Sequence, residues 1–196
     1  MGAHRQSIRE HLKESCRVKE SFSEDLLARI ESFAEHSAEA LARGAKIVLF
    51  GNGGSAADAQ HLAAELTVKL RADRPGLAAL ALTTNASVLT AAANDLGFER
   101  VFARQIESLV SPGDVLVALS TSGASPNIVR GIEAGALRGA FRVALTGETG
   151  GELARRVDLL LNVPSRDPQH IQEAHITIGH IVCLLIEQMR LGRAAP

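Results

Sequence analysis

Two ionisable side chains, His61 and Glu65, stand four residues apart directly after a glycine-rich loop, in the stretch GNGGSAADAQHLAAEL at residues 51–66. On a helix, residues four apart share one face, so the imidazole and the carboxylate would point into the same space. Histidine titrates near neutrality, and a partly buried glutamate can be brought there. The pair could therefore move protons at physiological pH. A solvent-exposed ion pair is the plainer interpretation of the same spacing, and both stay open at this point.

A second pair of polar residues, Gln172 and His180, lies on the helical pattern at residues 168–190. Eight residues place them about 80° apart around the helix axis, in one quadrant, and only the tertiary fold could bring them to His61. His175 falls about 140° from His180, so we exclude it from the predicted site. Because this helix is mostly apolar, Gln172 and His180 could also be hydrogen-bonded polar groups of the core.

The glycine-rich loop follows an apolar run at residues 45–50 and precedes a helical pattern, an arrangement that favours anion binding by free backbone amides. Gly51, Gly53 and Ala56 formally match a dinucleotide-binding pattern. That pattern expects an acidic residue after the next strand, where this chain has Leu-Thr-Thr-Asn at 82–85. No GxxxxGK[ST] loop occurs either. We therefore predict no nucleotide cofactor; a tight turn alone would need fewer glycines.

A loop rich in hydroxyl groups, STSGAS at residues 120–125, follows the most apolar strand pattern and opens a helix with Pro126 in its first turn. One serine is needed as the N-cap of that helix, and Ser125 is well placed for it. Capping does not explain Ser120, Thr121 and Ser122. Several hydroxyls and the free amides of a helix N-terminus suit the three oxygens of a phosphate monoester.

The elements that carry these loops alternate between short apolar runs and helical patterns. We predict strands at 45–50, 77–82, 114–119, 141–145 and 159–163, with helices at 54–70, 87–94, 98–109, 125–137, 151–156 and 168–190. Two helices are predicted within residues 5–43. Such alternation indicates right-handed crossovers and a parallel sheet covered on both faces. Ligands of such sheets bind beyond the carboxyl ends of the strands, where the two polar loops lie.

Length and composition indicate one soluble domain of 196 residues, with 46% hydrophobic and 22% charged residues and a formal net charge of −1. We divide it into a helical segment, 1–44, for packing or oligomerisation, and a main domain, 45–196. Aromatic residues make up only 3% and no basic cluster occurs, so no nucleic-acid partner is expected. Cys16 and Cys183 are too isolated for a disulfide framework. No signal peptide or membrane span is visible, so we expect a cytoplasmic protein.

Three motifs together resemble a known family. GNGGSxxDAxHxxxE at 51–65, STSGxS at 120–125 and IQExHxxxxH at 171–180 are similar to sugar isomerase (SIS) domains, and more narrowly to the phosphoheptose isomerases. The resemblance spans residues 20–190. It implies a three-layer αβα sandwich with a five-stranded parallel sheet, the SIS fold, preceded by N-terminal helices. It also implies a homotetramer with active sites between subunits and conversion of sedoheptulose 7-phosphate to D-glycero-D-manno-heptose 7-phosphate, for lipopolysaccharide core or other surface glycans.

The resemblance also assigns roles to residues. It implies that Glu65 and His180 are the acid–base pair, acting through an enediol. The residues implied to bind substrate are Asn52, Gly53, Gly54, Ser55, Glu65, Asn94, Asp95, Ser120, Thr121, Ser122, Ser125 and Gln172. One Zn²⁺ per subunit is implied on His61, Glu65, Gln172 and His180. An amide oxygen from Gln172 would be an unusual zinc ligand.

The chain departs from many relatives at His170, where a basic residue such as Arg or Lys is common, at Asn85, where Asp is common, and at Lys69, where Arg is common. The main alternative function is a non-catalytic SIS-domain protein that binds a protein partner such as the replication initiator. Relatives of that kind carry an uncharged residue at position 65, where this chain has glutamate. A sugar-sensing regulator would need a DNA-binding domain, and an amidotransferase a glutaminase domain; residues 1–44 are too short for either.

Overall fold

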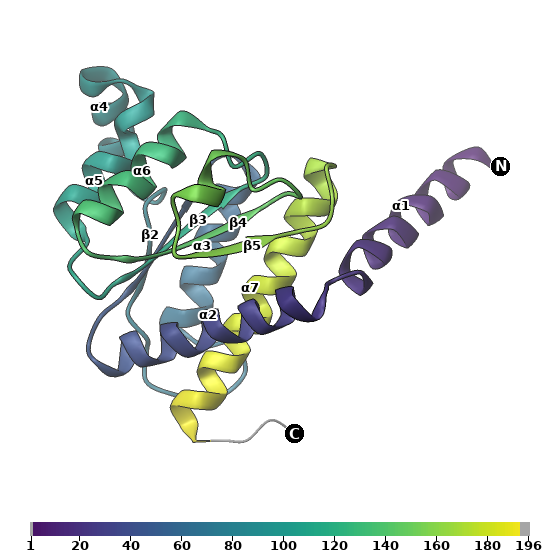
Figure 1. Ribbon diagram of the computed structural model, residues 1–196, viewed down its shortest axis with the longest axis horizontal. Helices are drawn as coiled ribbons and strands as arrows, with labels where there is room; N and C mark the ends of the chain where they lie inside the picture. The colour runs from purple at the N-terminus through teal and green to yellow at the C-terminus, as the bar shows by residue number, and fades with distance from the viewer. Residues whose placement is uncertain (1, 193–196) are drawn as a thin grey trace.

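Five parallel strands form the centre of the structure, a computed structural model that describes residues 2–192 (Figure 1). The strands are β1 (Ile47–Gly51), β2 (Ala79–Ala81), β3 (Val115–Ser120), β4 (Phe141–Thr146) and β5 (Leu159–Asn162), in the order β2-β1-β3-β4-β5. All neighbouring strands run parallel. The predicted fold class, a five-stranded parallel sheet between layers of helices, is confirmed.

The helices cover both faces of this sheet. They are α1 (Ala3–Glu20), α2 (Glu24–Ala42), α3 (Gly54–Thr67), α4 (Ala86–Leu96), α5 (Val101–Leu109), α6 (Pro126–Leu137) and α7 (Pro168–Leu191), with 3-10 turns η1 (Phe98–Arg100) and η2 (Gly151–Arg155). Helices α2, α3 and α7 lie on one face, and α5 and α6 lie on the other (Figure 1). Every helix predicted from the sequence is present, but α3 ends three residues before its predicted end.

Alternate residues of the strands fill two separate cores. Leu49, Val117 and Val143 are register partners on adjacent strands, and all three pack in the core beneath α2, α3 and α7. Phe50 and its register partner Ala118 face α5 and α6 instead. All five side chains are at most 3% exposed. Because both faces are covered, the strands are apolar throughout and show no polar alternation, which is why they were visible in the sequence.

Helices α3 and α7 lie unusually close together. A side-chain carbon added at Gly179 of α7 would stand 2.5 Å from the methyl groups of Leu62 on α3, so a larger residue there would force Leu62 to move. Leu62 is itself 3% exposed and belongs to the core beneath these helices. The contact holds the predicted site residues of α3 within reach of those of α7.

A buried ion pair closes the lower end of this contact. Arg74 Nε donates to Glu187 Oε2 of α7 at 3.0 Å, and the two side chains are 2% and 3% exposed. Glu187 also accepts hydrogen bonds from three successive backbone amides, at residues 70–72. Arg74 donates in turn to the carbonyl oxygens of Glu65 and Leu66, which belong to the last turn of α3. The chain therefore leaves the helix after Thr67 because its next amides and its last carbonyls have these partners.

The two N-terminal helices differ in their surroundings. Helix α2 contributes Ile30 and Phe33 to the core beneath α7 and so forms part of the helical layer. Helix α1 projects away from the body (Figure 1), and Ile8 and Leu12 on it are 59% and 60% exposed. The predicted packing or oligomerisation role of residues 1–44 stays a prediction. No helix within residues 2–192 is long and apolar enough to cross a membrane.

We expect Glu187→Gln to lower the free energy of unfolding by about 3 kcal/mol, because the buried Arg74 guanidinium loses its counter-charge. Urea denaturation followed by circular dichroism measures the change. The matched control is Glu133→Gln, which removes one partner of the exposed Glu133–Arg156 pair. That control is expected to cost less than about 1 kcal/mol. Equal effects of the two substitutions would contradict the structural role of Glu187.

The pH dependence of this effect follows from the pKa of Glu187. Burial raises the pKa, but the amides of residues 70 and 72 and the Arg74 guanidinium outweigh burial and hold it below its usual 4.5. A lowered pKa gives stability that is complete above the unfolded-state value and is lost as pH falls through the folded-state value. The stability difference between the parent chain and Glu187→Gln should therefore persist at neutral pH and shrink in acid below about pH 4.5.

Candidate active site

The glycine loop and the serine loop meet at the carboxyl ends of β1 and β3. The chain proceeds from β1 to β2 on one side and then crosses to β3 on the other side of β1, which makes this the topological switch point of the sheet. Asn52 and Asn127 join the two loops through reciprocal amide hydrogen bonds of 2.9 Å each. Asn127, which is buried on the first turn of α6, was not predicted. A polar residue in an otherwise apolar helix start was the one feature of the sequence that could have pointed to Asn127.

The glycine loop brings backbone close to α7. Gly53 has φ +55° and ψ −121°, a conformation that favours glycine. A side-chain carbon at Gly54 would stand 2.8 Å from Gln172 Oε1, so the Gln172 amide lies against the first turn of α3. Ser55 is buried directly beneath Gly51, which also has no space for a side chain. The loop therefore presents backbone rather than side chains to a ligand.

The serine loop uses two of its hydroxyls for its own shape. Ser120 Oγ accepts a hydrogen bond from the amide of Gly123, and Ser122 Oγ accepts one from the amide of Ala124, both at 3.2 Å. Ser125 occupies the N-cap position of α6, but its hydroxyl makes no capping bond to the described helix. The predicted capping role of the Ser125 side chain is therefore wrong. Its hydroxyl stands beside the free amides of the helix terminus.

A hollow of about 400 Å³ opens beside this loop, at the carboxyl ends of β3 and β4. It is lined by Thr121, Ser122, Gly147, Glu148, Thr149, Ser165, Arg166 and Ile171. Arg166 adds a cation that the sequence patterns did not point out; its side chain is 81% exposed and its Nε donates to Glu148 Oε2 at 2.5 Å. A phosphate placed here would meet hydroxyls and the guanidinium of Arg166, which is paired with the Glu148 carboxylate.

His61, Glu65 and His180 come together from two helices. The Nε2 atoms of His61 and His180 are 2.9 Å apart, and His61 Nε2 is 3.4 Å from Glu65 Oε1. The two rings meet edge to face at 72° with centroids 5.1 Å apart. The three side chains offer ligand atoms that all lie within 4.8 Å of one another. One imidazole must donate and the other accept at this separation, unless a cation lies between them.

Gln172 and His175 lie apart from this group. The Gln172 amide contacts Gly54, and seven residues of helix, about 10 Å, separate Gly54 from His61 along α3. His175 is fully buried, and its Nε2 lies 3.1 Å from the carbonyl oxygen of Thr146. Burial lowers the pKa of His175 to about 4, so this residue stays neutral at physiological pH. The structure therefore gives His175 a place in the core.

Asp58 is a polar residue near the group; it belongs to the motif at residues 51–65, but the sequence analysis gave it no role. Its Oδ2 is buried and has no hydrogen-bond partner among the described residues. Burial raises the pKa of Asp58, while the nearby His61 and His180 act to lower it. Its spacing of three from His61 on α3 would have placed both side chains on one helix face. A cation beside the two histidines would compensate this buried charge.

The remaining predicted residues lie on the opposite face or at the surface. Asn94 and Asp95 lie on α4, where Asn94 Nδ2 donates to Asp95 Oδ1 at 2.7 Å, and Asp95 lines a hollow that shares no residue with the one at the serine loop. Asn85 caps α4 by accepting from the amide of Val88 at 3.1 Å. Lys69 is exposed and lies 3.9 Å from Asp73.

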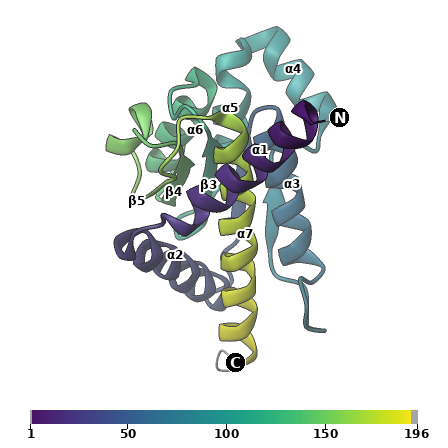
Figure 2. The same cartoon turned by 90° about the vertical axis from the view of Figure 1, so that its right-hand side faces the viewer.

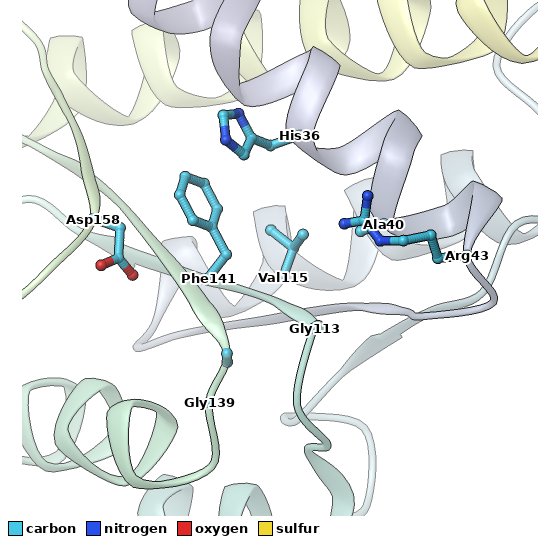
Figure 3. A pocket seen from close by; sticks show the side chains of 9 residues that line it. His36, Ala40, Arg43, Gly113, Val115, Gly139, Phe141 and Asp158 are labelled. Carbon is cyan, nitrogen blue, oxygen red and sulfur yellow. The ribbon is translucent and has the colours of Figure 1, made fainter.

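A further hollow, of about 350 Å³, lies at the amino ends of β3 and β4 (Figure 3). His36 of α2 stacks on Phe141 there, with ring centroids 4.4 Å apart and planes 5° apart. Parallel sheets bind ligands at the carboxyl ends of their strands, at the opposite edge from this hollow. The hollow is therefore a feature of how α2 packs on the sheet edge.

Comparison of the sequence with known protein families and proteins identifies its relatives. The sequence pattern of the SIS domain matches residues 10–147. The phosphoheptose isomerase of Aneurinibacillus thermoaerophilus is 48% identical over 183 residues, 92% of each chain. The chain belongs to the phosphoheptose isomerase family of SIS-domain enzymes.

Solved structures of the family agree closely with this one. Phosphoheptose isomerase GmhA from Neisseria gonorrhoeae superposes with a TM-score of 0.90 at 42% identity, covering 95% of this chain and 100% of the other. A phosphoheptose isomerase from Francisella tularensis gives a TM-score of 0.91 at 33% identity, covering 95% and 99%. The protein is accordingly an isomerase, and the family resemblance read from its three motifs is confirmed.

Gly123 offers a test of how tightly the serine loop is packed in this protein. Gly123 and Gly113 both have positive φ, +62° and +88°, but a side-chain carbon at Gly123 would collide with the Gly150 carbonyl, whereas none meets Gly113. Alanine at either position should cost about 1 kcal/mol of backbone strain. Gly123→Ala should cost about 2 kcal/mol more in thermal or urea unfolding, because the loop must also move. Equal losses of stability in the alanine variants of Gly123 and Gly113 would contradict the close packing at Gly123.

Proposed function

We propose that this protein converts sedoheptulose 7-phosphate to D-glycero-D-manno-heptose 7-phosphate. Membership of the phosphoheptose isomerase family supports this reaction. The observation that carries the mechanism is the meeting of Glu65 with the two histidines, His61 and His180, from separate helices. The product would enter heptose biosynthesis, for lipopolysaccharide core or other surface glycans.

Substrate binding divides between the loops. The phosphate would be held by Ser120, Thr121, Ser122 and Ser125 together with the amides at the start of α6, where the helix dipole favours an anion. The sugar would be held by Asn52, Gly53, Gly54, Ser55, Asn94, Asp95 and Gln172. Because Asn94 and Asp95 lie on α4 and away from the serine-loop hollow, their role requires a neighbouring subunit. We therefore propose a homotetramer with active sites at subunit interfaces.

The proton transfers follow from the positions of Glu65 and His180. The ketose loses a proton from C1, forming an enediol, and regains a proton at C2, while another proton moves from O1 to O2. Two side chains that can each hold or release a proton near neutrality are needed for these steps. Glu65 is partly buried, with 21% of its side chain exposed, and His180 shares the same group. We assign the acid–base pair to Glu65 and His180.

The same group fits a zinc ion. Two imidazoles and one carboxylate are the three protein ligands of several catalytic zinc sites. The unpartnered buried carboxylate oxygen of Asp58 adds negative charge beside them. His61, Glu65 and His180 would hold the ion, one per subunit. Gln172, the fourth predicted ligand, would have to turn from Gly54. When bound, zinc would polarise the sugar oxygens at C1 and C2.

A non-catalytic SIS-domain protein that binds a protein partner such as the replication initiator is the alternative that the sequence left open. It would not need a carboxylate at position 65. Here Glu65 lies 3.4 Å from His61, in the group with His180. That placement favours the isomerase over the binding protein.

Glu65→Gln should lower kcat at least about 100-fold while the substrate dissociation constant changes little, because the amide keeps the shape but cannot transfer a proton. Formation of the aldoheptose phosphate from sedoheptulose 7-phosphate measures kcat, and calorimetric titration measures binding. Glu133→Gln, on the exposed face of α6, serves as the control and should keep full activity. Undiminished turnover by Glu65→Gln would remove the acid–base assignment.

The zinc assignment has its own test. Treatment with a strong chelator, followed by desalting, should lower isomerase activity, and stoichiometric Zn²⁺ should restore it. Elemental analysis before and after treatment follows the metal content. Unchanged activity in protein shown to be free of metal would rule out an essential zinc ion.

A further inference from the structure

A second cluster of metal-ligating side chains lies where α1 meets α7. His11 Nε2 of α1 is 3.1 Å from Glu173 Oε1, and His170 Nδ1 is 3.4 Å from Glu173 Oε2. The two imidazole rings have centroids 4.5 Å apart and are tilted by 40°. Each histidine therefore approaches a different oxygen of one carboxylate. Their ligand atoms all lie within 4.8 Å of one another.

These distances suit a common cation. In a tetrahedral site with metal–ligand bonds near 2.1 Å, neighbouring ligand atoms are about 3.4 Å apart. The separations of His11 Nε2 from Glu173 Oε1, 3.1 Å, and of His170 Nδ1 from Glu173 Oε2, 3.4 Å, are close to that value, so each histidine lies at ligand distance from one oxygen of the carboxylate. His170 and Glu173 share a face of α7 because they are three residues apart, and α1 supplies His11 from the other side. Two histidines and a carboxylate leave one position of a tetrahedral site for water.

Polar groups outside the cluster orient the carboxylate. The Ser15 hydroxyl, one turn after His11 on α1, donates a hydrogen bond to Glu173. Lys19 Nζ in turn donates to Ser15 Oγ at 2.8 Å. Carboxylate ligands of metal ions are usually held by such outer hydrogen bonds. The carboxylate would therefore meet an ion in a defined orientation.

The cluster also lies at the place where α1 is attached to the rest of the protein. Helix α1 lies in front of α7 in Figure 2, and the two helices are in contact, but among the described side chains of α1 only Ser15 and Val18 are buried. His170 is 7% exposed at its side chain and is anchored in the body, whereas His11 is 42% exposed. An ion bound between them would join the exposed helix to the core.

We propose that His11, His170 and Glu173 bind a divalent transition-metal ion such as Zn²⁺, which fixes α1 against α7. This site shares no residue with the group of His61, Glu65 and His180. Ten residues of helix, about 15 Å, separate His170 from His180 along α7. The ion has a structural role, and its binding does not depend on the proposed isomerase chemistry.

The test measures zinc stoichiometry in full-length protein from which the active-site group has been removed by His61→Gln and His180→Gln. This double variant, stripped of metal, should still bind one equivalent of Zn²⁺ per chain in a calorimetric titration. Adding His11→Gln should weaken that binding at least about 100-fold, because a direct ligand is lost. Adding His4→Gln, which changes an exposed histidine of the same helix, should leave it unchanged. Co²⁺ in place of Zn²⁺ should give the visible absorption of a four-coordinate site.

Two outcomes would overturn the proposal. One is that the double variant binds no metal, and the other is that His11→Gln and His4→Gln bind equally well. Glu173→Gln provides a second route to the same result. Amide hydrogen exchange measures whether the ion holds α1 against α7. With free Zn²⁺ at 100 times its dissociation constant, the opening of α1 that permits exchange should slow about 100-fold. Unchanged exchange of the α1 amides on zinc binding would place the ion elsewhere.

Discussion

The close packing of α3 against α7 is the constraint on which the candidate site depends. At the first turn of α3, Gly54 touches Gln172, and farther along Gly179 admits Leu62. His61 and His180 meet in the middle of this contact. The buried Arg74–Glu187 pair holds the end of α3 against α7 and accounts for the last carbonyls of the helix. Larger residues at the two glycines would displace Gln172 and Leu62 and so disturb the contact that brings His61 to His180.

The loops at the carboxyl ends of β1 and β3 form the second half of the candidate site, and the strands themselves contribute no charged side chain to it. Its switch point brings two loops together, and the Asn52–Asn127 amide pair links them. The serine loop then offers neutral donors and a helix terminus to an anion, with Arg166 at the rim. Apart from Arg166 and Glu148, the ionisable side chains of the candidate site lie in the group on α3 and α7. The phosphate and the reacting carbons of the sugar would be recognised by different elements.

Local sequence patterns predicted most of the fold but only part of the candidate site. Continuous apolar runs marked all five strands, because each is covered on both faces; β2, an edge strand, is shorter than its pattern. The end of α3 could not be predicted, because it is set by Glu187, more than a hundred residues away in the chain. The Ser125 side chain was predicted to cap α6, but in the structure no described side chain makes a capping hydrogen bond to this helix. Asp58 lies in the first motif, three residues before His61, but it was given no role, because only the structure shows that its Oδ2 is buried without a partner among the described residues.

Helix α7 carries both histidine clusters, and its geometry keeps them independent. His170 and Glu173 lie on its first turns beside α1, whereas His180 lies about 15 Å farther along and faces α3. Ten residues also rotate the helix by about 80° net, so His170 points about 80° away from His180 around the axis, whereas Glu173 lies only about 20° from His180. Distance along the helix, rather than direction, therefore keeps the two clusters apart. A ligand change at one leaves the donors of the other in place. The same helix would therefore anchor α1 at its start and position the proposed acid–base pair farther along.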